Sequence, residues 1–289
     1  MPKTIVITGT ATGMGRATVN KFAVEGWNIV ATVRKESDLK AHAGLCYVKT
    51  VLLDVDDETA TVPFARLTLE QFDGVDALVN NAGYYQMGRL EGTSMEQVHR
   101  QYQTNVFGIA ALIKAFLPTF RAQRSGMIIN IASLTAEQGY PYSSVYASSK
   151  AAVALLSESL NIELAEFGII VRAILPGMSA TRIFTKIDRG DSIPDAYQAG
   201  IARFFASNSS TGSDPSVTAD VIYQAVMDPD PIAVRYYSAP DSASIPRAKR
   251  ILGADGYWQE FRNAVLGYPS DLWKTLVEKP GSIPVEIEV

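Results

Sequence analysis

Cysteine and histidine are almost missing from this sequence of 289 residues, and their scarcity excludes two kinds of site. Cys46 stands alone, so the chain can form no internal disulfide; this is typical of a reducing compartment, and we expect a cytoplasmic protein. Cys46 lies in the apolar run 45–48, where we expect it to be buried. His42 and His99 lie in polar helical contexts without a second ligand at metal-binding spacing, so we expect both at the surface and no metal site.

Long hydrophobic runs and an excess of basic residues are missing as well. The longest apolar stretch, Val106 to Ile113, is far shorter than a membrane span, and the first run, Ile5 to Ile7, is too short for a signal peptide. The net charge is −4 and the pI is near 5.3, with no cluster of Lys and Arg. These features argue against nucleic acid or an anionic membrane as the partner, and we expect a soluble protein that acts on a small molecule.

Short apolar runs alternate with longer amphipathic segments along most of the chain. The runs are nearly continuous rather than alternating, as expected when helices cover both faces of a parallel sheet. The predicted strands are 4–9, 28–34, 46–54, 77–81, 127–133, 169–175 and 232–238, and the predicted helices are 16–25, 58–72, 94–121, 144–167 and 217–227. This order predicts a single α/β domain built on a doubly wound parallel sheet, the Rossmann fold.

Two stretches depart from the alternation. Residues 182–213 follow Pro176-Gly177 and are rich in aromatics, glycine and serine; we expect a lid over the ligand crevice, with an ordinary surface excursion as the alternative. Residues 241–289 contain two short helical patterns and a proline-punctuated tail. They are too few for a domain, so we expect an extension packed on the domain of residues 1–240, with a subunit contact or a mobile tail as alternatives.

A glycine-rich turn, Thr8-Gly9-Thr10-Ala11-Thr12-Gly13-Met14-Gly15, joins the first predicted strand to the first predicted helix. Glycines let a pyrophosphate approach the backbone, and a helix N-terminus offers unpaired N–H groups at the positive end of its dipole. In this position the turn predicts a dinucleotide cofactor, although a tight strand-to-helix connection could use the same residues.

The end of the second predicted strand bears on which dinucleotide is bound. An acid there would pair with the ribose hydroxyls of NAD, whereas a cation would accept the 2′-phosphate of NADP. The sequence has Arg34 and Lys35 and no carboxylate at this point, which predicts NADP; an exposed basic turn is the alternative.

A candidate acid/base lies on the helix predicted over 144–167. Tyr146 and Lys150 are four residues apart and share a helix face, where an ammonium can lower the pKa of a phenol. Tyrosine then becomes a usable proton donor or acceptor for a carbonyl or hydroxyl oxygen. The spacing alone recurs by chance, but Ser133 ends a predicted strand at the edge of the sheet that carries the glycine turn.

Taken in order, these motifs resemble the short-chain dehydrogenase/reductase family over residues 4–185, in its Gly-x-x-x-Gly-x-Gly form, with Met14 where that family often has Ile. Asp54-Val55, Asn80-Asn81-Ala82-Gly83 and Pro176-Gly177 match further family segments. The resemblance implies a catalytic tetrad of Asn105, Ser133, Tyr146 and Lys150. The implied cofactor-binding residues are Gly9, Thr12, Gly13, Met14, Gly15, Arg34, Asp54, Val55, Asn81, Ala82, Gly83, Tyr146, Lys150, Pro176, Gly177, Ser179 and Thr181.

The resemblance also implies roles. Ser133 would hold the substrate oxygen, Tyr146 would exchange the proton, Lys150 would lower the pKa of Tyr146 and bind the nicotinamide ribose, and Asn105 would hold a water. The expected activity is NADP-dependent hydride transfer between a carbonyl compound and a secondary alcohol. A non-enzymatic NADP-binding regulator, or an epimerase or dehydratase with a tightly bound cofactor, is the alternative.

Aromatic residues near the motifs predict a hydrophobic substrate, although core or subunit-contact roles are equally compatible. The side chains concerned are Tyr84, Tyr85, Met87, Tyr140, Pro141, Tyr142, Met178, Phe184, Tyr197, Phe204 and Phe205. The resemblance implies a homodimer or homotetramer, with the helices predicted over 94–121 and 144–167 as contacts. The small and apolar residues that would permit close helix approach are Ala151, Ala152, Ala154, Leu155 and Ser159, although plain burial suits them equally.

Overall fold

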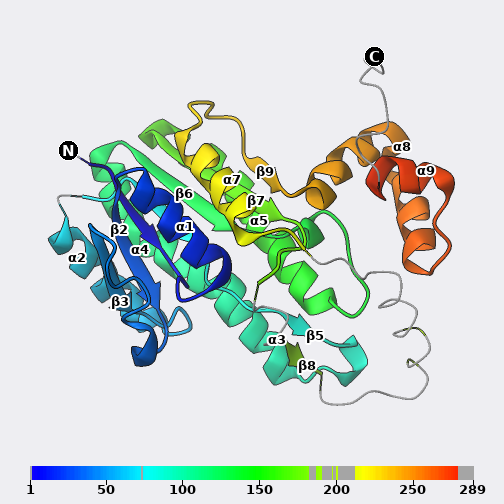
Figure 1. Ribbon diagram of the computed structural model, residues 1–289, viewed down its shortest axis with the longest axis horizontal. Helices are drawn as coiled ribbons and strands as arrows, with labels where there is room; N and C mark the ends of the chain where they lie inside the picture. The colour runs from blue at the N-terminus through cyan, green and yellow to red at the C-terminus, as the bar shows by residue number, and fades with distance from the viewer. Residues whose placement is uncertain are drawn as a thin grey trace.

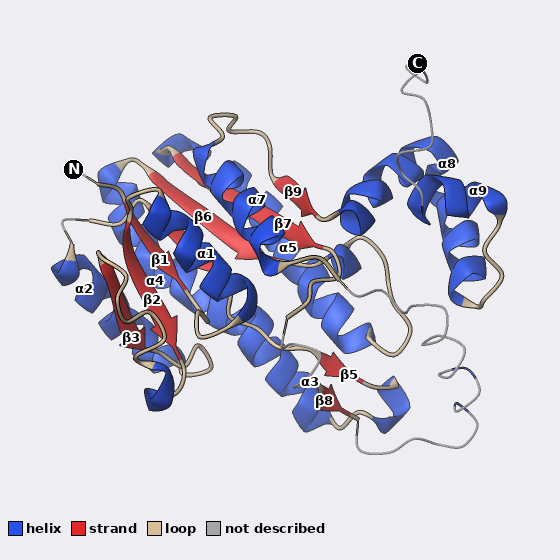
Figure 2. Ribbon diagram, in the orientation of Figure 1, coloured by secondary structure: helices blue, strands red, loops and turns tan. Residues whose placement is uncertain are grey.

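The computed structural model describes residues 2–72, 74–181, 187–190, 197, 200 and 212–278. A seven-stranded parallel sheet runs through these residues in the order β3-β2-β1-β4-β6-β7-β9 (Figure 2). Its strands are β1 (Thr4–Ile7), β2 (Asn28–Val33), β3 (Val48–Leu52), β4 (Ala77–Asn80), β6 (Gly126–Ile131), β7 (Ile169–Pro176) and β9 (Arg235–Ser238). The strand order reverses between β1 and β4, and that reversal places a crevice beyond the carboxyl ends of these strands.

Helices cover both faces of the sheet, which explains why the strand sequences are nearly continuous apolar runs (Figures 1 and 2). Ile5 and Ile7 point to one face, where α1 (Gly13–Val24) and α7 (Pro215–Met227) pack. Val6 points to the other, which is covered by α2 (Thr61–Gln71), α4 (Gly108–Gln123) and α5 (Ser144–Glu163). The predicted doubly wound Rossmann fold is confirmed.

The helix predicted over 94–121 is divided in the structure. It comprises α3 (Met95–Tyr102), one π-helical segment, Gln103–Phe107, and α4, and it begins with a capping box of Ser94 and Gln97. By length and composition the run Met95–Gln123 could cross a membrane, but α4 turns its apolar side into the core beside the sheet. A π-segment inside a helix often marks a functional position, and this one contains Asn105.

Two predictions about single residues are wrong. Cys46 is exposed because β3 begins only at Val48, which leaves Cys46 in the turn before this edge strand. His42 is buried, and its Nε2 lies 2.9 Å from the Thr10 hydroxyl beneath the glycine turn. Burial, with the nearby Arg16 charge, lowers the pKa of His42. His99 is exposed, as predicted.

The C-terminal residues form a helical unit at the end of the molecule opposite the N-terminus (Figure 1). It consists of α8 (Pro240–Val265), kinked at Gly253, then α9 (Asp271–Trp273) and a π-helical segment, Lys274–Glu278. Tyr257, Phe261 and Trp273 close a hydrophobic cluster over Leu134, which follows β6. The predicted tail, 280–284, lies outside the described residues.

Short elements complete the described chain. Most of the predicted lid lies outside the described residues, but β8 (Asp188–Arg189) is described and pairs with β5 (Gln86–Met87). The 3-10 turns are Glu36–Asp38, Glu58–Ala60, Leu90–Gly92, Leu134–Ala136 and Ala165–Phe167.

Candidate active site

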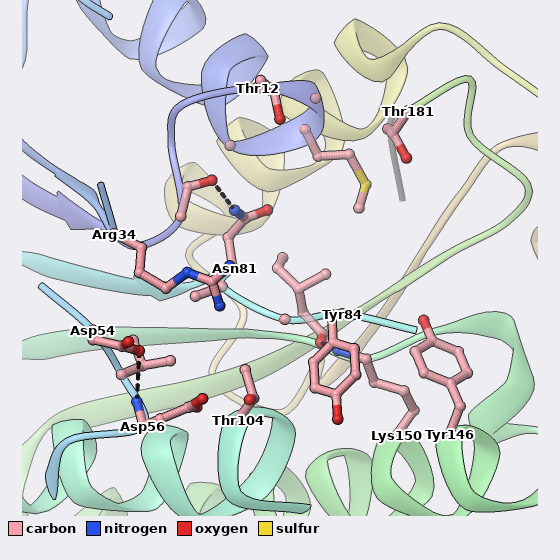
Figure 3. A pocket seen from close by; sticks show the side chains of 18 of the residues that line it. Thr12, Arg34, Asp54, Asp56, Asn81, Tyr84, Thr104, Tyr146, Lys150 and Thr181 are labelled. Carbon is pink, nitrogen blue, oxygen red and sulfur yellow. Dashed lines mark hydrogen bonds between the residues drawn. The ribbon is translucent and has the colours of Figure 1, made fainter. Parts of the chain in front are cut away.

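A cleft of about 760 Å³ opens beyond the carboxyl ends of β1, β2, β3, β4 and β6 (Figure 3). It runs from Arg34 and Asp54 at one end to Tyr146 and Lys150 at the other. The predicted site residues that line it are Gly9, Thr12, Gly13, Met14, Gly15, Arg34, Asp54, Val55, Asn81, Ala82, Gly83, Tyr146, Lys150 and Thr181. The structure therefore brings most of the predicted residues to one surface.

The glycine turn is held tightly against the end of β4. Gly9 has a φ of +69°, and a Cβ there would lie 2.9 Å from the Cα of Ala82, so a side chain has no room. Asn81 Nδ2 donates to the Thr8 and Gly9 carbonyls at 2.7 and 3.1 Å. Thr12, the N-cap of α1, makes no side-chain cap, which leaves the first N–H groups of the helix available on the cleft side.

The end of the cleft opposite Tyr146 and Lys150 carries both a cation, Arg34, and an acid, Asp54. Arg34 directly follows β2, is exposed, and forms no ion pair with any residue that the structure describes. Asp54 lies nearby and accepts a hydrogen bond from the Asp56 N–H at 3.2 Å (Figure 3). Its carboxylate therefore faces the cleft without neutralising Arg34.

Tyr146 and Lys150 project from one face of α5 into the end of the cleft opposite Arg34 (Figure 3). Burial raises the pKa of Tyr146 to about 12, against which a hydrogen bond with the Ser133 side chain acts to lower it. Burial also lowers the pKa of Lys150 to about 8, and its Nζ donates to the Ile131 carbonyl at 2.7 Å.

The expectation that Lys150 lowers the pKa of Tyr146 stays a prediction. Removal from water favours the neutral form of both side chains, and this effect dominates the pKa of each group. The Lys150 ammonium lies 5.9 Å from the centre of the Tyr146 ring and is hydrogen-bonded to the backbone instead.

Asn105 is buried in the π-helical segment and does not line the cleft. Its Oδ1 accepts from the Tyr84 N–H and its Nδ2 donates to the Tyr84 carbonyl, both at 3.1 Å. A Cβ at Gly83 would lie 3.1 Å from Asn105 Oδ1 and 3.5 Å from Lys150 Nζ. Asn105 therefore fixes the turn that separates it from Lys150.

A residue of the C-terminal helical unit holds the loop after β7 in place. Pro176, Gly177 and Ser179 do not line the cleft, unlike the predicted Thr181. Asp241, in the first turn of α8, accepts from the Met178 N–H at 2.7 Å and packs so closely on Gly177 that no side chain fits there. Burial raises the pKa of Asp241. The sequence carries no signal for this contact, because 63 positions separate the partners.

The sequence did not predict the other residues that line the cleft. They are Leu53, Asp56, Arg100, Thr104, Ile131, Ala132, Ile187 and Asp188. Arg100 and Thr104 are four residues apart on the helix that leads to Asn105, and that spacing could have placed both at the site. Arg100 pairs with Asp188 at 2.8 Å.

The residues predicted for the substrate pocket separate into groups. Tyr84 lines the cleft, and the Tyr85 ring lies 4.6 Å from the ring of Tyr146. Tyr140 instead packs on Phe261 of α8. Met87 is buried in β5, Pro141 is half-buried, and Met178 lies in the loop held by Asp241. Phe184, Phe204 and Phe205 lie outside the described residues.

Sequence comparison agrees with this geometry. The sequence model of the family described as short chain dehydrogenase matches residues 3–192, which contain every predicted site residue. The chain belongs to the short-chain dehydrogenase family. Among other members, the oxidoreductase YusZ of Bacillus subtilis is 35% identical over 236 residues, which cover 77% of this chain and 84% of YusZ.

Solved structures share the fold over most of the chain, among them short-chain dehydrogenases. One from Streptomyces avermitilis superposes with a TM-score of 0.77 at 28% identity, covering 91% of this chain and 98% of its own. ElxO with NADP bound (TM-score 0.71, 25% identity) covers 82% of this chain and 97% of its own. A Burkholderia phymatum member in complex with NAD (TM-score 0.74, 25% identity) covers 86% and 93%. Structural likeness to the family is therefore compatible with either nucleotide.

Proposed function

We propose that this short-chain dehydrogenase is an NADP-dependent oxidoreductase that interconverts a carbonyl compound and a secondary alcohol, with Tyr146 as the acid/base. The observation that carries the proposal is the placement of Tyr146 and Lys150 at one end of a single cleft whose other end presents Arg34. A regulator that only binds the nucleotide has no need of the buried tyrosine and lysine.

The residues present fit a dinucleotide. The tight turn at Gly9 and the uncapped start of α1 offer a backbone cradle for a pyrophosphate, and Arg34 offers an unpaired guanidinium for a 2′-phosphate. Asp54 and Val55 would hold the adenine end, and Thr181 and Lys150 the nicotinamide end. When bound, the nicotinamide supplies the acceptor or donor of hydride.

The chain's own groups handle the proton. With a pKa of about 12, Tyr146 keeps its Oη proton at neutral pH and can donate it to a carbonyl oxygen during reduction. Ser133, at the end of β6, supplies a hydroxyl beside Tyr146 that can hold the same oxygen. Lys150 would hold the nicotinamide end of the cofactor, and Asn105 fixes the 83–84 turn beside Lys150.

The deciding experiment is oxidation of NADPH and of NADH by the purified protein on carbonyl compounds graded from small aldehydes to ring ketones. We expect turnover with NADPH to exceed turnover with NADH. Arg34→Ala should weaken NADPH binding by about 10- to 100-fold and leave NADH binding unchanged, because only the former loses charge-assisted hydrogen bonds. Arg66→Ala, an exposed arginine of α2 outside the cleft, is the matched control.

Three other outcomes would count against the proposal. Equal use of NADH and NADPH would remove the cofactor assignment. Tight NADPH binding with no turnover on any member of the panel would support a regulator. Oxidised cofactor retained through purification, again without net turnover, would support an epimerase or dehydratase.

A further inference from the structure

Arg89 is a buried cation that has no anionic partner among the described residues. It follows β5 and is only 6% exposed, yet its Nε and Nη2 nitrogens are buried and make no hydrogen bond. Within the described part of the chain, no carboxylate forms an ion pair with it. Burying a guanidinium without a partner is costly, so these two donors require an explanation.

The two unpaired donors form one edge of the guanidinium. Nε–H and Nη2–H point in the same direction, side by side, and this edge matches the two oxygens of a carboxylate or of a phosphate. Glu91, the nearest acid along the chain, does not fill it, because Glu91 accepts from the Tyr197 hydroxyl at 2.8 Å instead. The unpaired edge is therefore shaped for an oxyanion from outside the described residues.

Two aromatic rings hold the guanidinium while leaving that edge unpaired. The Arg89 Cζ lies 5.5 Å from the centre of the Tyr142 ring and 5.0 Å from that of Tyr197, both within cation–π range. Tyr142 has a φ of +61°, a left-handed conformation that is costly for a bulky residue and that clusters at ligand sites. The Gly88 N–H fixes it by donating to the Tyr142 carbonyl at 2.8 Å.

Arg89 lies beside the reacting end of the cleft and outside the surface assigned to the cofactor. It does not line that cleft. Ser143, next to Tyr142 in the chain, has its Oγ 2.5 Å from the Tyr85 hydroxyl, and the Tyr85 ring packs 4.6 Å from the ring of Tyr146. Tyr142, Ser143 and Tyr85 therefore connect Arg89 to the proposed acid/base through successive contacts.

From this geometry we infer that Arg89, framed by Tyr142 and Tyr197, binds an anionic group of the substrate. The inference rests on the proposed function: the substrate is a carbonyl compound whose far end carries an oxyanion, and Arg89 sets specificity while Tyr146 serves the carbonyl. A carboxylate fits the two-donor edge directly, and a phosphate presents the same pair of oxygens.

The test compares oxo acids of increasing chain length, each beside its own methyl ester, in the NADPH assay. We expect kcat/KM for the best acid to exceed that of its ester by about 10- to 100-fold, mainly through KM. Arg89→Gln should remove this preference and keep turnover of the ester, which also shows that the variant folds. Arg89→Lys, which keeps the charge and loses the two-donor edge, should lose most of the preference.

Arg121→Gln, which removes an exposed arginine in the last turn of α4, is the charge-matched control and should keep the preference. A phosphorylated hydroxyketone that outperforms every oxo acid, in an Arg89-dependent way, would identify phosphate as the anion. Equal use of acid and ester by the unmodified protein would overturn the inference while the proposed function stands. If neither is reduced, the proposed function fails, and calorimetric binding of the saturated acid to the protein and to Arg89→Gln still decides the anion site.

Discussion

Tyr146 and Lys150 show at the scale of single residues how burial sets the chemistry of the cleft. The same loss of water raises the pKa of the phenol to about 12 and lowers that of the ammonium to about 8. At neutral pH the tyrosine therefore keeps its proton, whereas the lysine loses its charge as the pH rises through about 8. This arrangement suits the reduction of a carbonyl group.

Removal of the phenol hydroxyl gives the most direct test of this assignment. Tyr146→Phe should lower kcat by about 10²- to 10⁴-fold, the usual contribution of a positioned acid/base, because the variant loses the hydroxyl that exchanges the proton. Its dissociation constant for NADPH, measured by fluorescence titration, should stay within about two-fold, since the fold and the backbone cradle are untouched. Near-normal turnover would assign the proton transfer to another group.

The pH profile of reduction should follow Lys150 rather than Tyr146. Lys150 is charged below its pKa of about 8, and Tyr146 keeps its proton up to about 12. We therefore expect kcat/KM for carbonyl reduction to be constant at neutral pH and to fall as the pH rises through about 8, because Lys150 loses its charge there. A steady rate up to pH 10, measured at constant ionic strength, would show that the charge of Lys150 is not needed.

Residues at fixed local spacing were the part of the site that the sequence could predict. Tyr146 and Lys150 share a face because they lie one helical turn apart, and the glycine turn reaches the cleft because it ends β1. His42 and Asp241 were unpredictable for the opposite reason. Each is placed by packing against a distant segment, and polarity alone put His42 at the surface.

At the scale of elements, the C-terminal helices are tied to the loop after β6 by a charged group as well as by the hydrophobic cluster. Glu137 in this loop pairs with Arg235 of β9 and with Lys249 of α8, the latter at 2.8 Å. Burial alone would raise the pKa of Glu137, but its bonds to Lys249 and Arg235 outweigh burial and hold the pKa below its usual value. One carboxylate therefore joins three elements.

Glu137→Gln should destabilise the protein by about 1–3 kcal/mol near pH 7, because it leaves the half-buried Arg235 and Lys249 without their charged acceptor. A carboxyl whose pKa is lowered by folding stabilises the protein fully at pH values above its pKa in the unfolded state. That stabilisation is lost as the pH falls through the pKa of the folded state. The difference from the unmodified protein, measured by urea unfolding, should therefore shrink below about pH 4. Glu163→Gln, an exposed acid at the end of α5, is the control. A difference that persists unchanged into acid would contradict the ion-pair account.

Long periodic elements were predictable and irregular ones were not. Every predicted strand exists within a few residues of its expected bounds, because a strand covered on both faces must be apolar throughout. The π-helical segment at Gln103–Phe107 leaves the apolar spacing almost unchanged, so the sequence predicts a continuous helix there. The pair of two-residue strands, β5 and β8, is too short to have any period.

At the scale of the whole molecule, large apolar side chains remain on the outside of α5. Leu155 is 58% exposed and Ile162 is 80% exposed, seven positions apart on the same helix face, and Phe107 at the start of α4 is 49% exposed. Of the small residues named from the sequence, Ser159 is exposed beside them, whereas Ala154 is buried in the core. The face supports the prediction of a homo-oligomer.

The double variant Leu155→Glu, Ile162→Glu should shift the protein to monomers, because each subunit would bury two new carboxylates of like charge in the interface. Light scattering coupled to size-exclusion chromatography measures this directly. Val24→Glu, which changes an apolar residue that is 85% exposed on α1, should leave the assembly intact. A double variant with the mass of the unmodified protein would move the interface elsewhere.

The match to the family model ends at residue 192, but residues beyond it pack against the matched region. Tyr257 donates to Gln138 from 119 positions away, and its neighbours close over the loop that joins Ser133 to Tyr146. A relative's version of this loop cannot be transplanted here without its own C-terminal helices. Substitutions in this loop and in the C-terminal helices should therefore have coupled effects on stability, because residues in contact rarely change independently.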